Sequence, residues 1–398
     1  MAERHLPIEL VENIGKRLNT KIDVSRFRSV CKSWRSSIPR FNKPSLFPIR
    51  IKSPHILYGF GNRSVHKVMT LFENPVYHLT PSTNSSNSGC WVIKVKEGDD
   101  DQLGKITHTL LDPISGPPFV KPVFPNPDLN LLDFRLSELA KAYNCLHLLN
   151  GESVCPCRVA MSLNPNCPVL VIIFDGQLYD YKLGGHIQKC NALEAMSSFN
   201  HDDQEDVICY DNEFYAVSRC GKTVEFDFST RSVKHIIKSP PYPPVRTKGC
   251  RGFKENNNLV ESSGELLLVR GLSTRFEVNN CLKTEVQFNV YKLKVVDRKW
   301  GKKKWLEKSW IMMEASDLND RILFVGEDCR FSASTREFPG LAGNSIYFPY
   351  PDNENTNVIG LGVLNLNDGS HHLLPDSSPE SADIFKPITQ AKLAGLEL

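Results

Sequence analysis

Apolar residues near the start of the chain recur with the period of an α-helix. Leu10, Ile14 and Leu18 stand four residues apart with Val11 beside them, which predicts one apolar stripe along a helix. Pro7 suits the first turn of this helix, because the N–H that proline lacks would have no partner there. A helix of this kind has to bury its stripe against another surface.

A second apolar series follows shortly afterwards. Phe27, Val30 and Trp34 recur at helical spacing, with basic residues on the other side. We therefore expect a small helical domain over residues 1–42, with more hydrophobic surface than so short a stretch can bury by itself. The spacing leaves two alternatives open: the unit packs on its own chain, or it docks onto a second protein.

The pattern changes after this helical region. Three prolines between residues 39 and 48 interrupt the chain, and we expect a linker over residues 43–50. Over residues 51–398, short apolar runs alternate with turns rich in Gly, Asn, Asp, Ser and Pro, which is typical of β-strands. Only the segment Leu132–Tyr143 keeps a helical spacing, and it could equally form strands.

Tight-turn sequences followed by two apolar residues recur along this second region. Two-residue turns of this kind join antiparallel strands. The four clearest examples are Asp175–Tyr179, Asp211–Tyr215, Ser263–Leu267 and Gly343–Tyr347. Periods near 40–50 residues are typical of propeller blades, and the longer intervals leave room for two blades each. The spacing predicts a β-propeller of about seven blades, with an irregular β-sandwich as the alternative.

Three strands can be identified directly in the repeat that begins at Asp211. They are predicted over Glu213–Ser218, Thr223–Phe228 and Ser232–Ile237. A single blade cannot bury its apolar surface alone, so repetition around a ring is the natural solution. The predicted fold class is therefore α plus all-β, with a small helical domain followed by a propeller-like domain over residues 51–398.

Charge and hydropathy limit the kinds of partner. The 398 residues contain 48 Lys and Arg against 45 Asp and Glu, and the net charge of +3 gives no reason to expect attraction to nucleic acid or membranes. The apolar run Val169–Phe174 is far too short to span a bilayer. The N-terminus carries charges in place of an apolar signal core, so we expect a cytosolic or nuclear protein.

Motifs that carry chemistry are scarce. The sequence has no nucleophile elbow, zinc-protease motif or phosphate-binding loop. The 12 cysteines are expected to be free thiols in a reducing compartment, and the four between residues 145 and 167 lack the paired spacing typical of zinc ligands. The pair His371–His372 is assigned to an exposed hairpin end. We expect no cofactor and no metal.

The segment Trp300–Trp305 places three lysines between two tryptophans. One interpretation is a site that stacks on and pairs with a nucleic-acid strand. The other, which the near-neutral charge of the chain favours, is a lysine-rich hairpin tip between Val290–Val296 and Trp305–Trp310. The run could also serve as a nuclear import signal.

The string Leu-Pro-x-Glu-Leu, followed by Arg-Phe-Arg-x-Val-Cys-Lys-x-Trp-Arg, resembles an F-box, the docking module of substrate receptors in Skp–cullin–F-box ubiquitin ligases. The resemblance implies binding to a Skp-type adaptor and, through it, to a cullin. One departure is His5, which occupies a neighbourhood where many relatives carry a tryptophan. The residues that would supply the helical core and the face against the adaptor are Leu6, Pro7, Leu10, Ile14, Leu18, Phe27, Val30, Cys31 and Trp34.

A second resemblance extends over the rest of the chain. The segment Glu337–Phe348, preceded by Asp320–Gly326, is similar to the signature of a large plant F-box family with a propeller-type C-terminal domain; Val159–Pro165 and Gly89–Ile93 fit it more loosely. It implies a non-catalytic receptor that holds a client protein for ubiquitination, and it does not name the client. A binding scaffold outside any ligase and a propeller enzyme are the alternatives.

Overall fold

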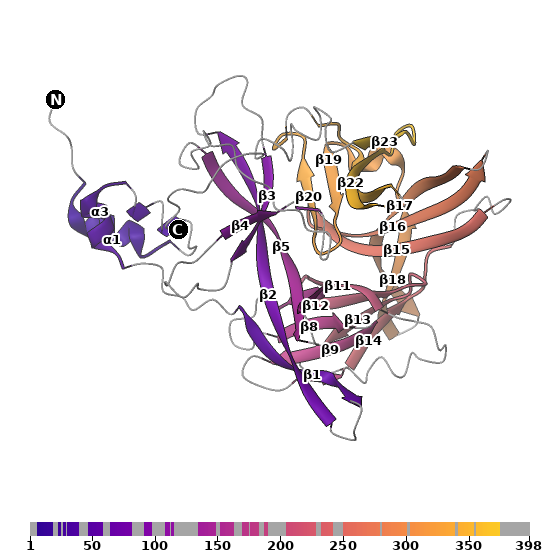
Figure 1. The fold of residues 1–398 in the computed structure, drawn as a ribbon, viewed down its shortest axis with the longest axis horizontal. Helices are drawn as coiled ribbons and strands as arrows, with labels where there is room; N and C mark the ends of the chain where they lie inside the picture. Colours follow the sequence, from indigo (N-terminus) through magenta and orange to yellow (C-terminus); the bar gives the residue numbers. More distant parts are fainter. Residues whose placement is uncertain are drawn as a thin grey trace.

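The computed structural model describes residues 6–18, 23–24, 27–28, 30–39, 47–58, 64–81, 91–97, 108–111, 113–114, 134–148, 152–162, 169–174, 176–182, 187–189, 204–227, 232–241, 250–278, 281–300, 303–338, 341–353 and 356–374. Two regions can be distinguished. Helices α1 (Ile8–Gly15) and α3 (Lys32–Ser37) lie at one end of the molecule, outside the sheets (Figure 1). The remaining described elements are mostly β-strands.

The strands form five sheets, numbered here in chain order. The first sheet contains β1 (Ile49–Tyr58), β2 (Ser64–Pro81), β3 (Trp91–Glu97), β4 (His108–Leu111), β5 (Phe134–Leu148) and β6 (Glu152–Pro156). The second contains β7 (Arg158–Met161), β8 (Val169–Phe174), β9 (Gln177–Lys182) and β10 (Ile187–Lys189). The third contains β11 (Gln204–Tyr210), β12 (Glu213–Ser218), β13 (Thr223–Asp227) and β14 (Ser232–Ile237).

The fourth and fifth sheets contain the remaining described strands. The fourth contains β15 (Cys250–Ser262), β16 (Glu265–Val278), β17 (Cys281–Trp300) and β18 (Lys303–Met312). The fifth contains β19 (Arg321–Val325), β20 (Arg330–Ser334), β21 (Ser345–Asn353), β22 (Thr356–Asn365) and β23 (His371–Leu374). A short 3-10 helix, η3 (Ala315–Leu318), connects the two sheets.

The five sheets close into a ring, because each hydrophobic cluster joins one sheet to the next and the fifth returns to the first. Clusters join the first and second sheets through Leu71 and Leu170, the second and third through Val171 and Ala216, and the third and fourth through Val217 and Leu268. The fourth and fifth meet through Val269 and Leu323, and the fifth and first through Phe324 and Val76. The ring is a propeller, so the β-sandwich alternative is wrong.

Some strands inside the sheets, such as β8, are buried on both faces. In β8, Val169, Val171 and Ile173 point toward the third sheet, whereas Leu170 and Ile172 pack against the first. Successive residues of a strand point to opposite faces, so a strand between two other sheets needs apolar residues at every position. This explains the continuous apolar run that the sequence shows at Val169–Phe174.

The expected number of about seven blades is wrong: the part of the chain that the structure describes forms five sheets. The long intervals between turns are taken up by long strands and not by extra blades. β17 has 20 residues and β5 has 15, each far longer than a typical blade strand. The number of blades can be inferred from the spacing of turns along the sequence only when the strands are of similar length.

Three of the four predicted turns join hairpins. Asp211 and Asn212 have φ of 51° and 60°, and Ser263 and Gly264 have φ of 54° and 77°, as two-residue turns between antiparallel strands require. β8 and β9 likewise pair antiparallel, with Gly176 at φ of 67° between them; Asp175 itself lies outside the described residues. The fourth is different: Asn344, with φ of 55°, leads into β21, which pairs in parallel with β19.

Several local predictions are settled. The third sheet confirms the strands expected over Glu213–Ser218 and Ser232–Ile237. β13 covers residues 223–227 of the strand expected over Thr223–Phe228, and Phe228 lies outside the described residues. Residues 134–143 of the segment with helical spacing lie in the single strand β5, so the helix alternative is wrong for them; residues 132–133 lie outside the described part of the chain. Among the described residues, no helix is both long and apolar enough to cross a membrane.

Candidate docking surfaces and the polar centre of the ring

The helical unit has a small core of its own. Val11, Val24, Phe27 and Ile38 are buried together. Leu18 and Trp34 pack against them, and the rings of Phe27 and Trp34 lie 4.6 Å apart between centroids. The predicted residues Leu18, Phe27 and Trp34 therefore serve this core, and their side chains are not the exposed part of the unit.

Gly15 is explained by the packing of this core. A Cβ atom at Gly15 would lie 2.4 Å from Cγ2 of Ile38 and 3.3 Å from Cε1 of Phe27. These distances are too short for any larger residue without a shift of the neighbours. Helix α1 thus approaches the segment after α3 so closely that a larger residue would have to displace the side chain of Ile38, which favours glycine despite its cost of about 1 kcal/mol in helix propensity.

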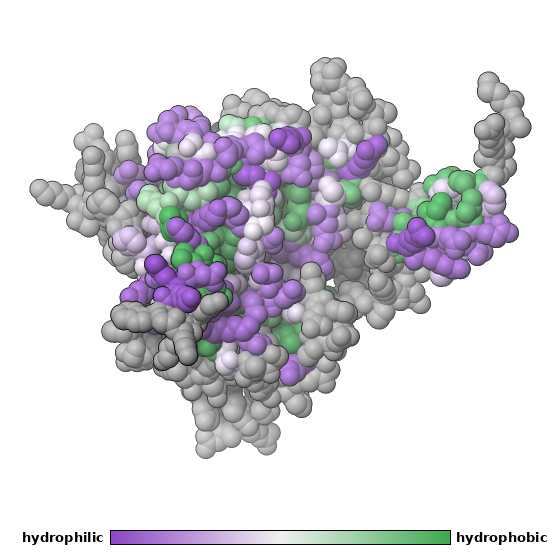
Figure 2. Space-filling view, turned by 180° about the vertical axis from the view of Figure 1, so that it is seen from behind, coloured by the Kyte–Doolittle hydropathy of each residue, from purple (hydrophilic) through white to green (hydrophobic). Residues whose placement is uncertain are grey.

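The other predicted residues form an exposed apolar face. Leu6 is 48% exposed, Leu10 49%, Ile14 42% and Val30 60%, and Pro7 and Cys31 are also exposed. Ile8, which the sequence analysis did not single out, is 44% exposed and belongs to the same region of the chain. Figure 2 shows hydrophobic side chains gathered on one side of the helical unit and hydrophilic ones on the other. We call Leu6, Ile8, Leu10, Ile14 and Val30 the apolar docking face.

The expected single stripe on the first helix is therefore wrong. Val11 and Leu18 turn toward the internal core, whereas Leu10 and Ile14 face outward. The second apolar series is not one continuous helix either. Cys31 has extended backbone angles, with φ of −161° and ψ of 174°, and α3 begins after it. The break turns Val30 out of the core that Phe27 and Trp34 share.

Hydrogen bonds from two arginines, Arg28 and Arg35, hold the helical residues 27–28 against α3. Nη1 of Arg28 donates to the carbonyl oxygen of Arg35 at 2.8 Å and also to that of Ile38. Nε of Arg35 donates in return to the carbonyl oxygen of Arg28 at 3.1 Å. The carbonyl groups at the end of α3 thus gain partners that the helix itself does not provide. These contacts fix the shape of the unit and leave its apolar docking face open.

The centre of the ring is polar and charged. Nζ of Lys94 in β3 donates to both carboxylate oxygens of Asp328 at 3.0 Å, and both side chains are 0% exposed. Nη2 of Arg330 lies 2.8 Å from Oδ1 of Asp206 in a second buried ion pair. Burial raises the pKa of Asp328, and the charge of Lys94 opposes that shift. The first pair joins the last sheet to the first, and the second joins the fifth sheet to the third.

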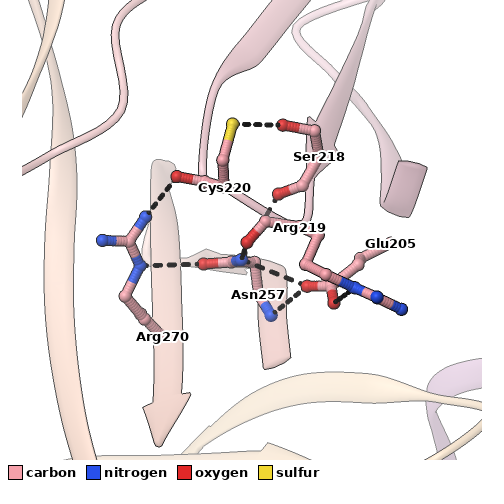
Figure 3. A network of polar contacts seen from close by, with 6 residues as sticks. All are labelled: Glu205, Ser218, Arg219, Cys220, Asn257 and Arg270. Carbon is pink, nitrogen blue, oxygen red and sulfur yellow. Dashed lines mark hydrogen bonds and ion pairs between the residues drawn. The ribbon is translucent and has the colours of Figure 1, made fainter. Parts of the chain in front are cut away.

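A further network ties the third and fourth sheets together (Figure 3). Oε2 of Glu205 accepts hydrogen bonds from the backbone N of Asn257 at 2.7 Å and from its Nδ2 at 3.1 Å. Oδ1 of Asn257 accepts from Nε of Arg270 at 3.0 Å. Nη2 of Arg270 donates to the carbonyl oxygen of Cys220 at 2.9 Å. Burial raises the pKa of Glu205, and the hydrogen bonds from Asn257 oppose the shift.

These carboxylates have structural partners, which bears on the enzyme alternative. Asp206, Asp328 and Glu205 are each bound to a cation or to an amide of another sheet. Within the described ranges, no three His, Cys, Asp or Glu side chains gather as a metal ion requires. His371 and His372 are exposed in the edge strand β23. The polar centre therefore has the chemistry of a brace between sheets.

The cysteines and the basic segment fall partly within the described residues. Cys145 and Cys157 are buried free thiols, and the side chains of the other two cysteines in that cluster lie outside the described residues.

The basic segment lies at the tip of the hairpin between β17 and β18, where Trp300 pairs with Lys303. The hairpin interpretation is thereby confirmed for the backbone.

Comparison with known proteins gives two domain matches. A model of the F-box domain matches residues 4–45, and a model of the KIB1-4 beta-propeller matches residues 58–368. Similar proteins in Arabidopsis thaliana include F-box protein SKIP23, which is 29% identical over 435 residues, covering 96% of this chain and 93% of its own. F-box protein At2g17036 is 25% identical over 405 residues, with coverage of 96% and 92%. F-box protein At4g35733 is 26% identical over 384 residues, with coverage of 94% and 95%.

Proposed function

We propose, because the chain belongs to the family of F-box proteins with a KIB1-4 beta-propeller, that it is the substrate receptor of a Skp–cullin–F-box ubiquitin ligase. In this function the helical unit binds a Skp-type adaptor and the propeller binds a client protein. The protein itself performs no catalysis. We expect it to work in the cytosol or the nucleus.

The apolar docking face is the observation that supports this proposal. Its five residues are exposed even though the unit has a complete core of its own. Each side chain is roughly half exposed, so covering it is worth about 1 kcal/mol, and the five together supply about 5 kcal/mol. Exposed apolar residues that cluster in this way mark surfaces for protein partners.

The contribution of the ligase would be placement. A receptor that tethers a client near the charged ubiquitin enzyme raises the effective concentration of the reacting groups, commonly into the millimolar range. The ring of five sheets is suited to this, since its hydrophobic clusters join each sheet to the next. The client identity is left open by these features.

Substitution of the docking face tests adaptor binding directly. Ile14→Asp should weaken binding to a purified Skp-type adaptor at least about 100-fold, because it removes an apolar contact and buries a charge in the interface. Ile236→Asp is the matched control, since Ile236 is 54% exposed on the third sheet and lies away from the docking face. Both variants should keep the wild-type urea unfolding midpoint. Equal adaptor affinity in the two variants would refute the proposed face.

The ligase part needs a separate experiment. Lengthening residues 39–48 with flexible Gly and Ser should slow client ubiquitination more than client binding, if rigid placement matters. If the protein co-purifies with the adaptor but without a cullin, the ligase hypothesis is wrong and the protein is a binding scaffold outside any ligase. Proximity labelling should then be compared between the wild type and a variant with alanine at Leu6, Pro7 and Leu10. Client proteins should still be labelled by the variant, whereas the adaptor and the cullin should no longer be labelled.

A further inference from the structure

The hairpin of β17 and β18 concentrates the positive charge of the protein. Residues 292–308 contain eight Lys or Arg and two Asp or Glu, a net charge of +6, whereas the whole chain carries only +3. The rest of the molecule is therefore net negative. A local excess of this size attracts acidic partners and raises the rate at which they associate.

One face of this hairpin is already used within the ring. Trp310 and Tyr291 belong to the cluster between the third and fourth sheets, and Nε1 of Trp310 donates to Oγ1 of Thr223 at 3.1 Å. Nζ of Lys308 lies 2.6 Å from a carboxylate oxygen of Glu225 in the third sheet. Residues that alternate with these along each strand must point to the opposite face.

That opposite face is partly uncovered. The register pairs Lys292 with Ile311, Lys294 with Ser309 and Arg298 with Trp305 across the two strands. Ile311 is 43% exposed and Trp305 is 47% exposed. Large apolar side chains therefore alternate with basic ones on a surface that faces away from the third sheet.

A groove lies on this face, next to η3. Its volume is about 500 Å³, and it is lined by Glu265, Lys292, Lys294, Ile311, Met312, Met313 and Asp317. Lys292 is paired with Glu265. Lys294 is exposed and has no ion-pair partner within the portion of the chain that the structure describes. Its charge is available to a bound carboxylate.

We propose that this groove and the adjoining face of β17 and β18 form the client-docking surface, and that the occupant is an acidic protein segment with a bulky apolar anchor. The inference rests on the proposed function, since it specifies the chemistry of the client. Ile311 and the two methionines would receive the apolar anchor, and methionine adapts to side chains of different shape. Lys294 would pair with an acidic residue of the segment, and Trp305 would add a rigid aromatic contact.

A protein segment fits this surface better than a nucleic-acid strand does. Lys292 and Arg298 are already paired with Glu265 and Glu307, which leaves too few unpaired cations on the described part of this face to follow a phosphate backbone. The groove also ends in aliphatic and thioether side chains, which offer no stacking surface for bases. In a peptide with an apolar side chain between carboxylates, the apolar side chain would contact the apolar residues of the groove and a carboxylate would contact Lys294.

The test uses the full chain and a short fluorescent peptide of alternating Glu and Leu. The peptide should bind the wild-type protein, and both Lys294→Glu and Ile311→Asp should weaken binding at least about tenfold. Raising the salt concentration should weaken binding as well, because Lys294 is exposed. The matched controls are Lys182→Glu and Ile236→Asp, which change exposed residues of the second and third sheets and should bind the peptide as the wild type does.

The outcomes separate this surface from the proposed function. Wild-type peptide affinity in Lys294→Glu and Ile311→Asp would overturn the docking surface, as would equal binding of a Lys-Leu peptide. Preferential binding of a thymidine oligonucleotide would overturn it in favour of nucleic acid. Adaptor affinity of the same two variants should equal that of the wild type, whereas Ile14→Asp should lose the adaptor and keep the peptide. A protein that binds the peptide but no adaptor would contradict the proposed function alone.

Discussion

Replacing Asp328 with asparagine should weaken the closure of the ring between its last and first sheets. The substitution leaves the ammonium group of Lys94 fully buried without the carboxylate to which it donates two hydrogen bonds of 3.0 Å. Removing one partner of a buried ion pair costs about 3–5 kcal/mol. Since domains are stable by only about 5–15 kcal/mol, the variant should lose a large part of its stability.

The magnitude belongs at the lower end of that range. Burial already raises the pKa of Asp328, which means that the ionised carboxylate is itself costly to bury. Asparagine keeps one oxygen that can accept a hydrogen bond from Lys94. We therefore expect a loss of about 3 kcal/mol. The positive charge of Arg158 also interacts with the carboxylate of Asp328. Removing the carboxylate would therefore leave two positive charges near each other, which opposes any increase in stability from burying one ionised group fewer.

Urea unfolding of the single variant and of the double variant Lys94→Met with Asp328→Leu distinguishes charge burial from simple loss of contacts. Replacing both partners with apolar side chains of similar size is often neutral or stabilising, so the double variant should recover most of the loss. Amide hydrogen exchange should accelerate in β3 and β20 of the single variant before the other sheets. If the double variant is as unstable as the single variant, or the single variant is unchanged, the reasoning about the buried charge is wrong.

Three other substitutions test separate parts of the molecule. Gly15→Ala should destabilise the helical unit by about 1–3 kcal/mol through overpacking, against a gain of about 1 kcal/mol in helix propensity, and a circular-dichroism melt that rises instead would contradict the packing account. Burial lowers the pKa of His78 below 6.5, and the carboxylate of Glu337 only partly opposes this. The neutral imidazole of His78 therefore makes its full contribution to stability above pH 6.5, and this contribution is lost as the pH falls through the pKa of the folded state. His78→Leu should abolish this pH dependence of the urea unfolding midpoint. Gly221→Ala should loosen the contact between the third and fourth sheets, because a Cβ there would lie 1.7 Å from Nη2 of Arg270 and its φ is +83°; thermal unfolding at the wild-type temperature would speak against it.

Local features of the structure could be predicted from short stretches of sequence. The strands of the third sheet follow from short apolar-rich runs bounded by turn residues, and the turn at Asp211 and Asn212 follows from residue types that tolerate positive φ. The helical unit was recognisable from a linear string, because its residues contact one another over short separations. In each case the residues that decide the structure are neighbours in the chain.

The apolar docking face shows where such prediction ends. All nine expected residues of the helical unit are apolar at helical spacing or belong to its motif, yet only some are exposed. Val11 packs inside and Leu10 faces outward, although the two are adjacent. Spacing identifies a helix with apolar residues, but the position of the neighbouring helices decides which of them are covered.

The amino-acid sequence by itself determined the kinds of element, their turns and the family to which the chain belongs. The tertiary structure alone decided that five sheets close the ring, that Lys94 meets Asp328 from 234 positions away, and that basic and apolar residues of one hairpin share a groove. The physical reason is that periodicity and turn chemistry act between neighbours in the chain. The number of sheets and the partners of buried charges depend on how strands of unequal length pack together.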